Sequence, residues 1–569
     1  MKGNRKSINR KSREARYEIV AIQQALFKRN QKLIEASIAR PPKYLAEYEA
    51  EVLRRTKSFR EAISPKELIQ RAQTVDIVYI GDYHTLRPAQ KTFLHVAEGL
   101  VKAGRQAGKG QEPLTIFAME MVETEKQATL DAYMKGKWSK AKENRFLSEV
   151  IGPDHWLVGN WENYKPILEF ARQNNILVAG IEGKGGTKLH TRSDSLARRD
   201  KHMAETIVEL LSKYPFHTIM VLVGELHIAP PHLPKMVRKL AGTRNLKKPK
   251  CLILYQNREE IYWKLVKQGK EDTIEVVHIK GDEYCSLNTP PHIVQQSYVN
   301  WLEAGETLVD SPDLGDKFRE IAEIIAQFLG IDLKGALDQV EVYSAHDLSF
   351  FARLKQSKAF TKSELDIIRE QVLSSESYTI PNMGMVYLAK LSLNHIAEEA
   401  SHFIHYVCAK SSREPADLVN SFYARCLEEA LGFFGSKVIN PKRKCDHQRD
   451  FLQDIETFRE KGIAAVDGEA YRLARFVIAH KDMEKGKSKK SDPWLKVLYS
   501  QDVDMFNRLT HALGYMLGDR LYYGLKRDRI SKEEIRNLFH ERFDEEEQPL
   551  LTYFALCRRL SSIRIPKRL

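Results

Sequence analysis

Two segments of the chain end an apolar run with the same short pattern, a glycine followed three residues later by a histidine. The first is I-V-Y-I-G-D-Y-H over 77–84, and the second is V-L-V-G-E-L-H over 221–227. Histidine is a general acid or base near neutral pH and a common metal ligand. The repeated pattern therefore marks His84 and His227 as candidates for chemistry.

Two other apolar runs end in a carboxylate, Glu120 in A-M-E-M and Glu182 in G-I-E-G. Asp82 and Glu225 stand beside the two histidines. The carboxyl ends of parallel strands meet at one edge of a sheet, so up to four carboxylates are expected to converge with the two histidines. His84, Glu120 and His227 would then bind a divalent metal or perform acid–base work. A separation above about 12 Å between the two imidazoles would contradict one shared site.

The elements expected to position these residues form an α/β fold, a mostly parallel sheet flanked by helices. The apolar runs are continuous rather than alternating, as in strands buried on both faces. The predicted strands are 74–81, 114–120, 176–182 and 217–224, with helical connections at 88–104, 161–174 and 195–213. Three further strands are predicted at the sheet edge, at 251–255, 261–266 and 274–279. The α/β domain is expected to span 73–295.

Residues 1–72 predict a basic helical arm, with helices over 17–38 and 42–72. This segment has 18 Lys and Arg against 8 Asp and Glu, and it carries +10 of the chain's net charge of +14. Such charge favours an anionic partner such as nucleic acid, a membrane surface or an acidic protein. The alternative is a solvated helical hairpin with no partner.

Residues 300–569 predict an all-α domain, with Gly and Pro sparse inside long helical segments. The predicted helices are 316–329, 345–357, 363–375, 385–411, 415–434, 448–482, 495–524 and 531–542. Within them, N-H-I-A-E-E-A-S-H places His395, Glu399 and His402 on one helix face. Glu399 and His402 have the E-x-x-H spacing of di-iron bundles.

That spacing occurs once in the helical half, whereas di-iron bundles need it twice. The favoured interpretation is therefore a polar, partly buried helix. His346, Asp347 and His511 are also interpreted as structural.

The chain's 569 residues predict more than one domain. Its six cysteines are scattered without a C-x-x-C pair, which argues against a zinc ribbon and fits a reducing compartment. No apolar run approaches the roughly 18 residues of a membrane span, and no signal peptide or lipidation site is seen. The expected location is cytoplasmic, and the oligomeric state stays open.

The motifs together resemble the ChaN-like haem-binding uptake family, in the superfamily of Tiki proteases and erythromycin esterases. The resemblance covers about 75–290 and rests on the order and spacing of several segments. They are G-D-Y-H (81–84), A-M-E-M (118–121), Q-A-T-L-D-A-Y (127–133), W-E-N-Y-K-P-I-L-E-F-A-R (161–172), R-R-D-K-H-M-A (198–204) and G-E-L-H (224–227).

The resemblance implies a site built from His84, Glu120, Arg199 and His227. Arg199 would pair with a carboxylate or orient an anionic substrate group. It also implies haem as a ligand, for which Tyr83, His84 and His155 are the candidate axial ligands. His155 lies in 133–160, a segment interpreted as a helical lid.

Three functions remain open from the sequence. The first is binding of haem or an iron-related ligand. The second is hydrolysis of an ester or amide, either metal-dependent or by acid–base action of the histidines and Glu120. The third is a scaffold whose helical region recruits a partner.

Overall fold

The computed structural model divides the chain into two compact units. The described residues are 2–37, 43–107, 115–136, 161–184, 195–304, 313–344, 347–357, 365, 368–369, 372, 377–380, 383–389, 392–410, 418–460, 468–486, 502–545 and 547–566. The helical unit comprises Met1–Leu26 and Asp310–Ile565, and the α/β unit comprises Phe27–Val309 and Pro566–Leu569. The long helix α1 (Lys2–Ser37) contributes to both.

An eight-stranded sheet forms the centre of the α/β unit, in the order β1-β7-β8-β6-β2-β5-β3-β4. The strands are β1 (Glu61–Ile63), β2 (Ile77–Asp82), β3 (Thr115–Glu123), β4 (Leu177–Glu182), β5 (Thr218–Gly224), β6 (Cys251–Gln256), β7 (Val276–Lys280) and β8 (Glu283–Ser286). Strands β4, β3, β5, β2, β6 and β8 are parallel, and β7 runs antiparallel to β1 and β8. The predicted mostly parallel sheet is confirmed.

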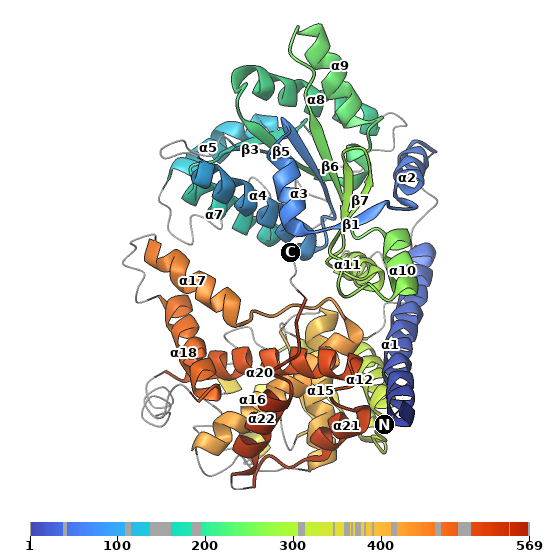
Figure 1. Ribbon diagram of the computed structural model, residues 1–569, viewed down its shortest axis with the longest axis vertical. Helices are drawn as coiled ribbons and strands as arrows, with labels where there is room; N and C mark the ends of the chain where they lie inside the picture. Colours follow the sequence, from blue (N-terminus) through green and yellow to red (C-terminus); the bar gives the residue numbers. More distant parts are fainter. Residues whose placement is uncertain are drawn as a thin grey trace. The chain divides into compact units, whose positions relative to one another are not determined.

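Helices cover both faces of this sheet (Figure 1). They are α2 (Lys43–Thr56), α3 (Pro65–Ala72), α4 (Arg87–Ala107), α5 (Gln127–Lys135), α7 (Lys165–Gln173), α8 (Ser195–Lys213), α9 (Leu233–Thr243), α10 (Glu259–Gln268) and α11 (Pro291–Ala304). Helices α3, α4, α5 and α7 pack on alternate strand residues such as Val78, Phe117 and Met220 to form one apolar core. Helix α8 packs against β4, β5 and α9.

The register of the central strands brings their carboxyl ends to one level. Asp82, the last residue of β2, stands opposite Gly224, the last residue of β5. On the other side of β5, Met119 of β3 pairs with Leu222, so Glu120 follows at the same edge. A parallel arrangement therefore places both G-x-x-H segments and Glu120 together.

Two predicted elements of the α/β unit are wrong. The segment 261–266, predicted as a strand, lies inside α10, where Ile261, Tyr262, Leu265 and Val266 are buried at helical spacing. Its aromatic and β-branched residues favour a strand locally, but the helix is ended by Gly269 in the left-handed conformation.

The single helix predicted over 42–72 is also wrong. It is divided into α2, strand β1 and α3. Strand β1 pairs with β7, and the Ser64 side chain caps α3 by accepting a hydrogen bond from the Glu67 amide. The short strands β1 and β8 were not predicted.

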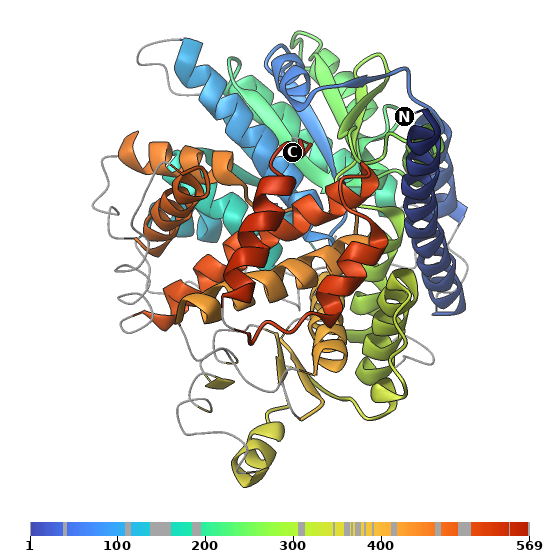
Figure 2. The same cartoon turned by 60° about the horizontal axis from the view of Figure 1, so that its bottom comes forward.

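The second unit is mainly helical (Figure 2). Its further helices are α12 (Leu314–Leu329), α13 (Phe350–Ser357), α15 (Leu393–Ala409), α16 (Leu418–Ile439), α17 (Gln448–Glu460), α18 (Glu469–Glu484), α20 (Val503–Lys526), α21 (Lys532–His540) and α22 (Gln548–Arg559). Helix α16 is almost wholly buried and packs against α15, α20 and α22.

A small three-stranded sheet accompanies these helices, formed by β9 (Glu341–Ser344), β10 (Tyr378–Ile380) and β11 (Met385–Leu388). The helix predicted from residue 385 therefore begins only at Leu393, because 385–388 pair with β9 and β10. Among the described residues, no helix combines the length and apolar character that crossing a membrane requires.

Candidate functional site

Asp82 holds the His84 ring at the end of β2. The Nδ1 atom of His84 lies 2.8 Å from the Asp82 carboxylate, with geometry for donating its proton. Asp82 is buried and also accepts hydrogen bonds from the Tyr164 hydroxyl at 2.6 Å and the Gln90 amide at 2.5 Å. A carboxylate on Nδ1 fixes the orientation of an imidazole and strengthens the other nitrogen as a base or ligand.

Arg199, on helix α8, pairs with the carboxylates that end two neighbouring strands. Its Nη2 donates to Glu120 of β3 and, at 2.6 Å, to Glu182 of β4, while its Nε donates to Glu182 at 2.9 Å. Backbone amides satisfy the remaining oxygens, from Gly224 to Glu120 at 2.5 Å and from Gly183 to Glu182 at 2.8 Å. Both carboxylates are almost fully buried, so the guanidinium supplies their compensating charge.

The pKa values of the two glutamates are shifted in opposite directions. Burial acts to raise the pKa of Glu120, but attraction to Arg199, His227 and His84 outweighs it and lowers the pKa to about 2. Burial raises the pKa of Glu182, and repulsion from Glu120 adds to it against the pull of Arg199. Glu120 is therefore the fixed negative charge of the site.

A second aspartate holds His227. The residue lies in the short helix η3 (Glu225–Ile228), and its Nδ1 is 2.5 Å from the Asp200 carboxylate. The other Asp200 oxygen accepts a hydrogen bond from the Tyr48 hydroxyl at 2.9 Å. On the far side of the ring, Nε2 lies 3.8 Å from Glu120. His227 thus links Asp200 to the Arg199–Glu120 pair.

Gly224 marks the point where these groups meet. A Cβ atom at Gly224 would stand 3.4 Å from Nε2 of His84, 3.5 Å from Oε2 of Glu120 and 3.6 Å from Cδ2 of His227. The two imidazole atoms are therefore no more than about 7 Å apart, which satisfies the requirement set from the sequence. A Cβ at this position would be in ordinary contact with all three groups, so a side chain larger than alanine would enter the space between the rings.

The cluster has a buried floor and a partly exposed rim. Glu120, Glu182, Asp200 and His227 are at most 3% exposed. The side chains of His84 and Arg199 are 22% and 23% exposed. An imidazole and a guanidinium are thus the groups that an incoming molecule would reach.

Tyr83 and Glu225 belong to a separate network. Glu225 accepts hydrogen bonds from the Gln256 amide at 2.8 Å, from Arg258 at 2.8 Å and from the Tyr83 hydroxyl at 3.0 Å. Burial raises the pKa of Tyr83, with the Glu225 charge adding to it. A tyrosine binds haem iron as phenolate, so this surrounding disfavours Tyr83 as a ligand. His155, together with 137–160 of the expected lid, lies outside the described residues.

The predicted metal set does not have the geometry of a preformed site. Glu120 uses both oxygens on Arg199 and Gly224. Within the described part of the chain, the groups whose three candidate ligand atoms lie within 4.8 Å of one another are both in the helical unit. A metal at His84, Glu120 and His227 would require Arg199 to release Glu120.

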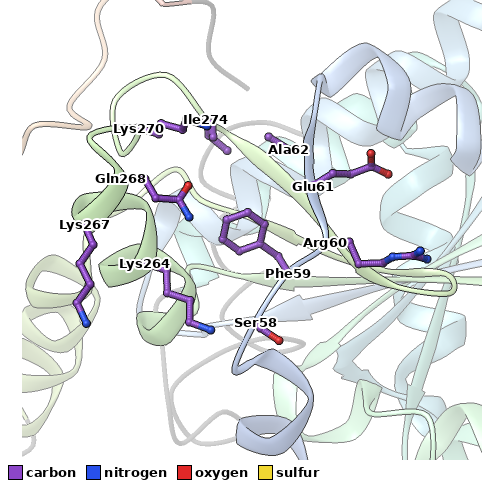
Figure 3. Close-up of a pocket in the computed structure, with 10 residues that line it drawn as sticks. All are labelled: Ser58, Phe59, Arg60, Glu61, Ala62, Lys264, Lys267, Gln268, Lys270 and Ile274. Carbon is purple, nitrogen blue, oxygen red and sulfur yellow. The ribbon is translucent and has the colours of Figure 1, made fainter.

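A cavity of about 570 Å³ lies elsewhere in the α/β unit, between the segment that leads into β1 and helix α10 (Figure 3). Its lining includes Arg60, Lys264, Lys267 and Lys270, and none of the predicted site residues. Strand β1 is at the edge of the sheet, with three strands between it and β2. This basic cavity is distinct from the histidine cluster.

Residues 68–184 match the model of the family described as haem-binding uptake, Tiki superfamily, ChaN. This part of the chain resembles the ChaN family. A solved structure of cofacial haem binding to ChaN of Campylobacter jejuni is 14% identical, covers 40% of this chain and 92% of that chain, and has a TM-score of 0.30. No curated protein matches the sequence.

The ChaN-like match confirms the resemblance seen in the motifs and includes His84, Glu120 and Glu182. Arg199, Asp200 and His227 lie beyond its end. The structure nevertheless brings all six residues into one cluster.

The sequence prediction placed Asp82 at the sheet edge but did not predict its pairing with His84, and it missed Asp200 and the tyrosines that support the two aspartates. Asp82 stands inside the G-D-Y-H pattern and Asp200 directly follows Arg199, so adjacency to predicted site residues was an available signal. Tyr48 comes from the basic arm, and nothing in its local sequence indicates a contact with Asp200.

We expect His84 to remain protonated to a higher pH than an ordinary histidine. Burial acts to lower its pKa, but the hydrogen bond and charge of Asp82, with Glu120, outweigh it and raise the pKa above 6.5. The stability gained from the charged ring is fully present below the ordinary pKa and is lost as pH rises through the raised one. Histidine NMR titration measures this.

The Asp82→Asn substitution should lower the pKa of His84 in that titration. His217, whose pKa burial lowers, is the internal control and should not move. A His84 pKa that is at or below the ordinary value, or that does not respond to Asp82→Asn, would contradict the pairing.

Replacing Arg199 by methionine should destabilise the α/β unit by about 3–5 kcal/mol, because it leaves two buried carboxylates without their cation. Loss of hydrogen-exchange protection in β3 and β4 measures this without assuming that both units unfold together. Arg198→Met, at an exposed neighbour on the same helix, should change protection by no more than about 0.5 kcal/mol. Equal protection in both variants would show that Arg199 does not hold the site.

Proposed function

We propose that the cluster around Gly224 is an acid–base active site and that the α/β unit hydrolyses a small ester or amide. The observation that carries the proposal is the convergence of two imidazoles, each with Nδ1 on a buried aspartate, beside one buried, charged glutamate. An Asp–His pair of this kind orients the ring and stabilises its protonated form during proton transfer.

His84 is the residue suited to direct proton transfer, because its ring is 22% exposed whereas that of His227 is 3% exposed. Neutral His84 would take a proton from water as the oxygen of that water attacks the carbonyl carbon. The imidazolium would then return the proton to the leaving oxygen or nitrogen as its bond to the carbonyl carbon breaks.

Arg199 and Glu120 would set the electrostatics of this step. The partly exposed guanidinium offers positive potential at the rim, where negative charge develops on the carbonyl oxygen. Glu120 holds Arg199 in place and faces Nε2 of His227. The class of substrate rests on the superfamily resemblance, and the acid–base roles rest on the geometry.

The test is hydrolysis of a panel of aryl and alkyl esters and anilides by the full chain, with metal chelator present. His84→Asn should lower kcat/KM by about 10²–10⁴-fold, as expected for loss of a general acid or base. In the wild type, the rate should rise with pH to an apparent pKa above 6.5, because His84 must be neutral to accept a proton.

His217→Asn is the matched control, since His217 is a partly buried histidine of the same unit outside the cluster. It should retain the wild-type rate. Absence of hydrolysis across the panel in the wild type, or equal rates in the two variants, would contradict the proposal.

Haem binding is the second candidate, favoured by the family match over residues 68–184, which contains His84. A histidine whose Nδ1 donates to a carboxylate is a suitable axial ligand for haem iron. A porphyrin also needs an apolar slot, whereas the described side chains beside His84 in the cluster are charged or polar. The described side chains of the cluster therefore suit an axial ligand of haem iron better than they suit the apolar porphyrin ring.

Titration of the purified chain with haemin should give a shifted Soret band if this function holds. The candidate axial ligands are tested by His84→Ala, Tyr83→Phe and His155→Ala, and the variant that removes the true ligand should lose the band. The control His217→Ala should retain it. We expect His84→Ala to have the largest effect, because burial and Glu225 oppose ionisation of Tyr83. A spectrum identical to free haemin in the wild type would exclude specific binding.

A further inference from the structure

A polar cluster lies between three helices of the helical unit. Glu398 of α15, Glu429 of α16 and His511 of α20 each place one candidate ligand atom within 4.8 Å of the other two. The three helices are in direct contact, α15 with α16 and α16 with α20. A mixed carboxylate and imidazole set on facing helices is the usual way that helical bundles hold transition metals.

One oxygen of Glu398 lacks a hydrogen-bond partner within the described part of the chain. The residue is 4% exposed, its Oε2 accepts from Arg443 at 2.9 Å, and its Oε1 is buried with no partner. A buried carboxylate oxygen without a donor is costly, so such an atom calls for an explanation. A cation bound at Oε1 would provide one.

His402 adds a second such atom. It lies one turn after Glu398 on α15, and its buried Nε2 has no hydrogen-bond partner among the described residues. Its Nδ1 lies 3.4 Å from Glu399, which orients the ring. On α16, Gly432 leaves the room that the ring occupies, because a Cβ there would collide with Nε2.

A second glycine shapes the same region. Gly514 of α20 faces the Cβ of Glu429, and a side chain at 514 would displace that glutamate. Two glycines on adjacent helices thus make space for an imidazole and a carboxylate. The cluster is therefore a built feature of the helix packing.

We propose that Glu398, Glu429 and His511 bind a divalent transition-metal ion. Two carboxylates and one or two imidazoles suit Zn²⁺, Fe²⁺, Mn²⁺ or Co²⁺, whereas Mg²⁺ and Ca²⁺ prefer oxygen ligands alone. The side chain of His511 is 48% exposed, so this ligand is accessible from solvent.

Arg443 supports the site from outside the ligand set. Its guanidinium donates to Oε2 of Glu398 at 2.9 Å and to the Tyr515 hydroxyl at 2.7 Å. Tyr515 stands one turn beyond His511 on α20, with its ring 3.8 Å from the imidazole. Such outer partners orient metal ligands and are often needed for full affinity.

A second group, Cys445, His447 and Asp519, also places three ligand atoms within 4.8 Å. There the buried Lys437 ammonium lies 2.8 Å from Asp519 and already supplies positive charge. In the Glu398 group, Arg443 pairs with Oε2 of Glu398 and His511 with Oε2 of Glu429, each at 2.9 Å, which leaves Oε1 of Glu398 without a cation in the described ion pairs. The Glu398 group is therefore the better cation site.

The sequence had singled out His395, Glu399 and His402 instead. Of these, His395 contacts Ser392 at the start of α15, and Glu399 accepts from the Thr379 hydroxyl at 2.8 Å. Among these three residues, His402 has the buried ring nitrogen without a described partner, whereas the proposed imidazole ligand is His511 of α20.

The test is metal binding by the full chain, purified without a histidine tag and stripped with chelator. Titration with Co²⁺ should give d–d absorption bands that saturate at one ion per chain, without a thiolate charge-transfer band. Glu398→Gln and His511→Asn should each weaken binding by more than the roughly 10–100-fold typical of outer partners. Elemental analysis after Zn²⁺ loading gives the same comparison without a spectrum.

His540→Asn is the control, because His540 is an exposed histidine of the same unit outside the cluster, and it should bind as the wild type does. Because Glu398→Gln alters a buried residue, circular dichroism of each variant checks that the variant is folded. If Glu398→Gln is unfolded, His511→Asn, at an exposed residue, decides the test. No stoichiometric binding by the wild type overturns the proposal. The proposal is also overturned if the Co²⁺ spectrum shows a thiolate charge-transfer band and binding is lost only in His447→Asn. That result would assign the metal to the Cys445 group.

Discussion

The α/β unit depends on one guanidinium placed between two buried carboxylates. Parallel strands β3 and β4 end in Glu120 and Glu182 at the same level, and neither could stay charged there without a cation. Helix α8 supplies it as Arg199, and the next residue, Asp200, is thereby directed at His227. One helical position thus fixes both the charge of the site and the orientation of one imidazole.

The helical unit meets the same constraint in another way. Glu398 is buried on α15, and Arg443 satisfies only one of its two oxygens. In the α/β unit, Arg199 and backbone amides bind all four carboxylate oxygens of Glu120 and Glu182. In the helical unit we assign the remaining oxygen, Oε1 of Glu398, to a metal ion. Glycines at 432 and 514 make room in this region for the His402 ring and for Glu429. Under that proposal, a guanidinium offsets the desolvation cost of the buried carboxylates in one unit, and a metal ion contributes to offsetting it in the other.

Local sequence predicted the central strands and the approach of His84 to His227, because buried parallel strands read as continuous apolar runs and end at one edge. It failed where distant segments decide the structure. The run at 261–266 has strand-forming residues, yet tertiary packing and Gly269 make it helical. Tyr48 and Asp200 are 152 positions apart, and Glu429 and His511 are 82 positions apart. Such pairs depend on packing that no local pattern encodes, whereas Asp82 was within reach of the motif itself.

The most direct test of the central claim, that both histidines share one site through Glu120, is NMR of their ring nitrogens in Glu120→Gln beside Glu225→Gln. Glu120→Gln removes the charge that faces both imidazoles, so the signals of His84 and His227 should shift together. Glu225→Gln, which alters the neighbouring Tyr83 network, should leave both signals in place. A shift of only one histidine, or of neither, in Glu120→Gln would show that the two G-x-x-H segments do not form one site.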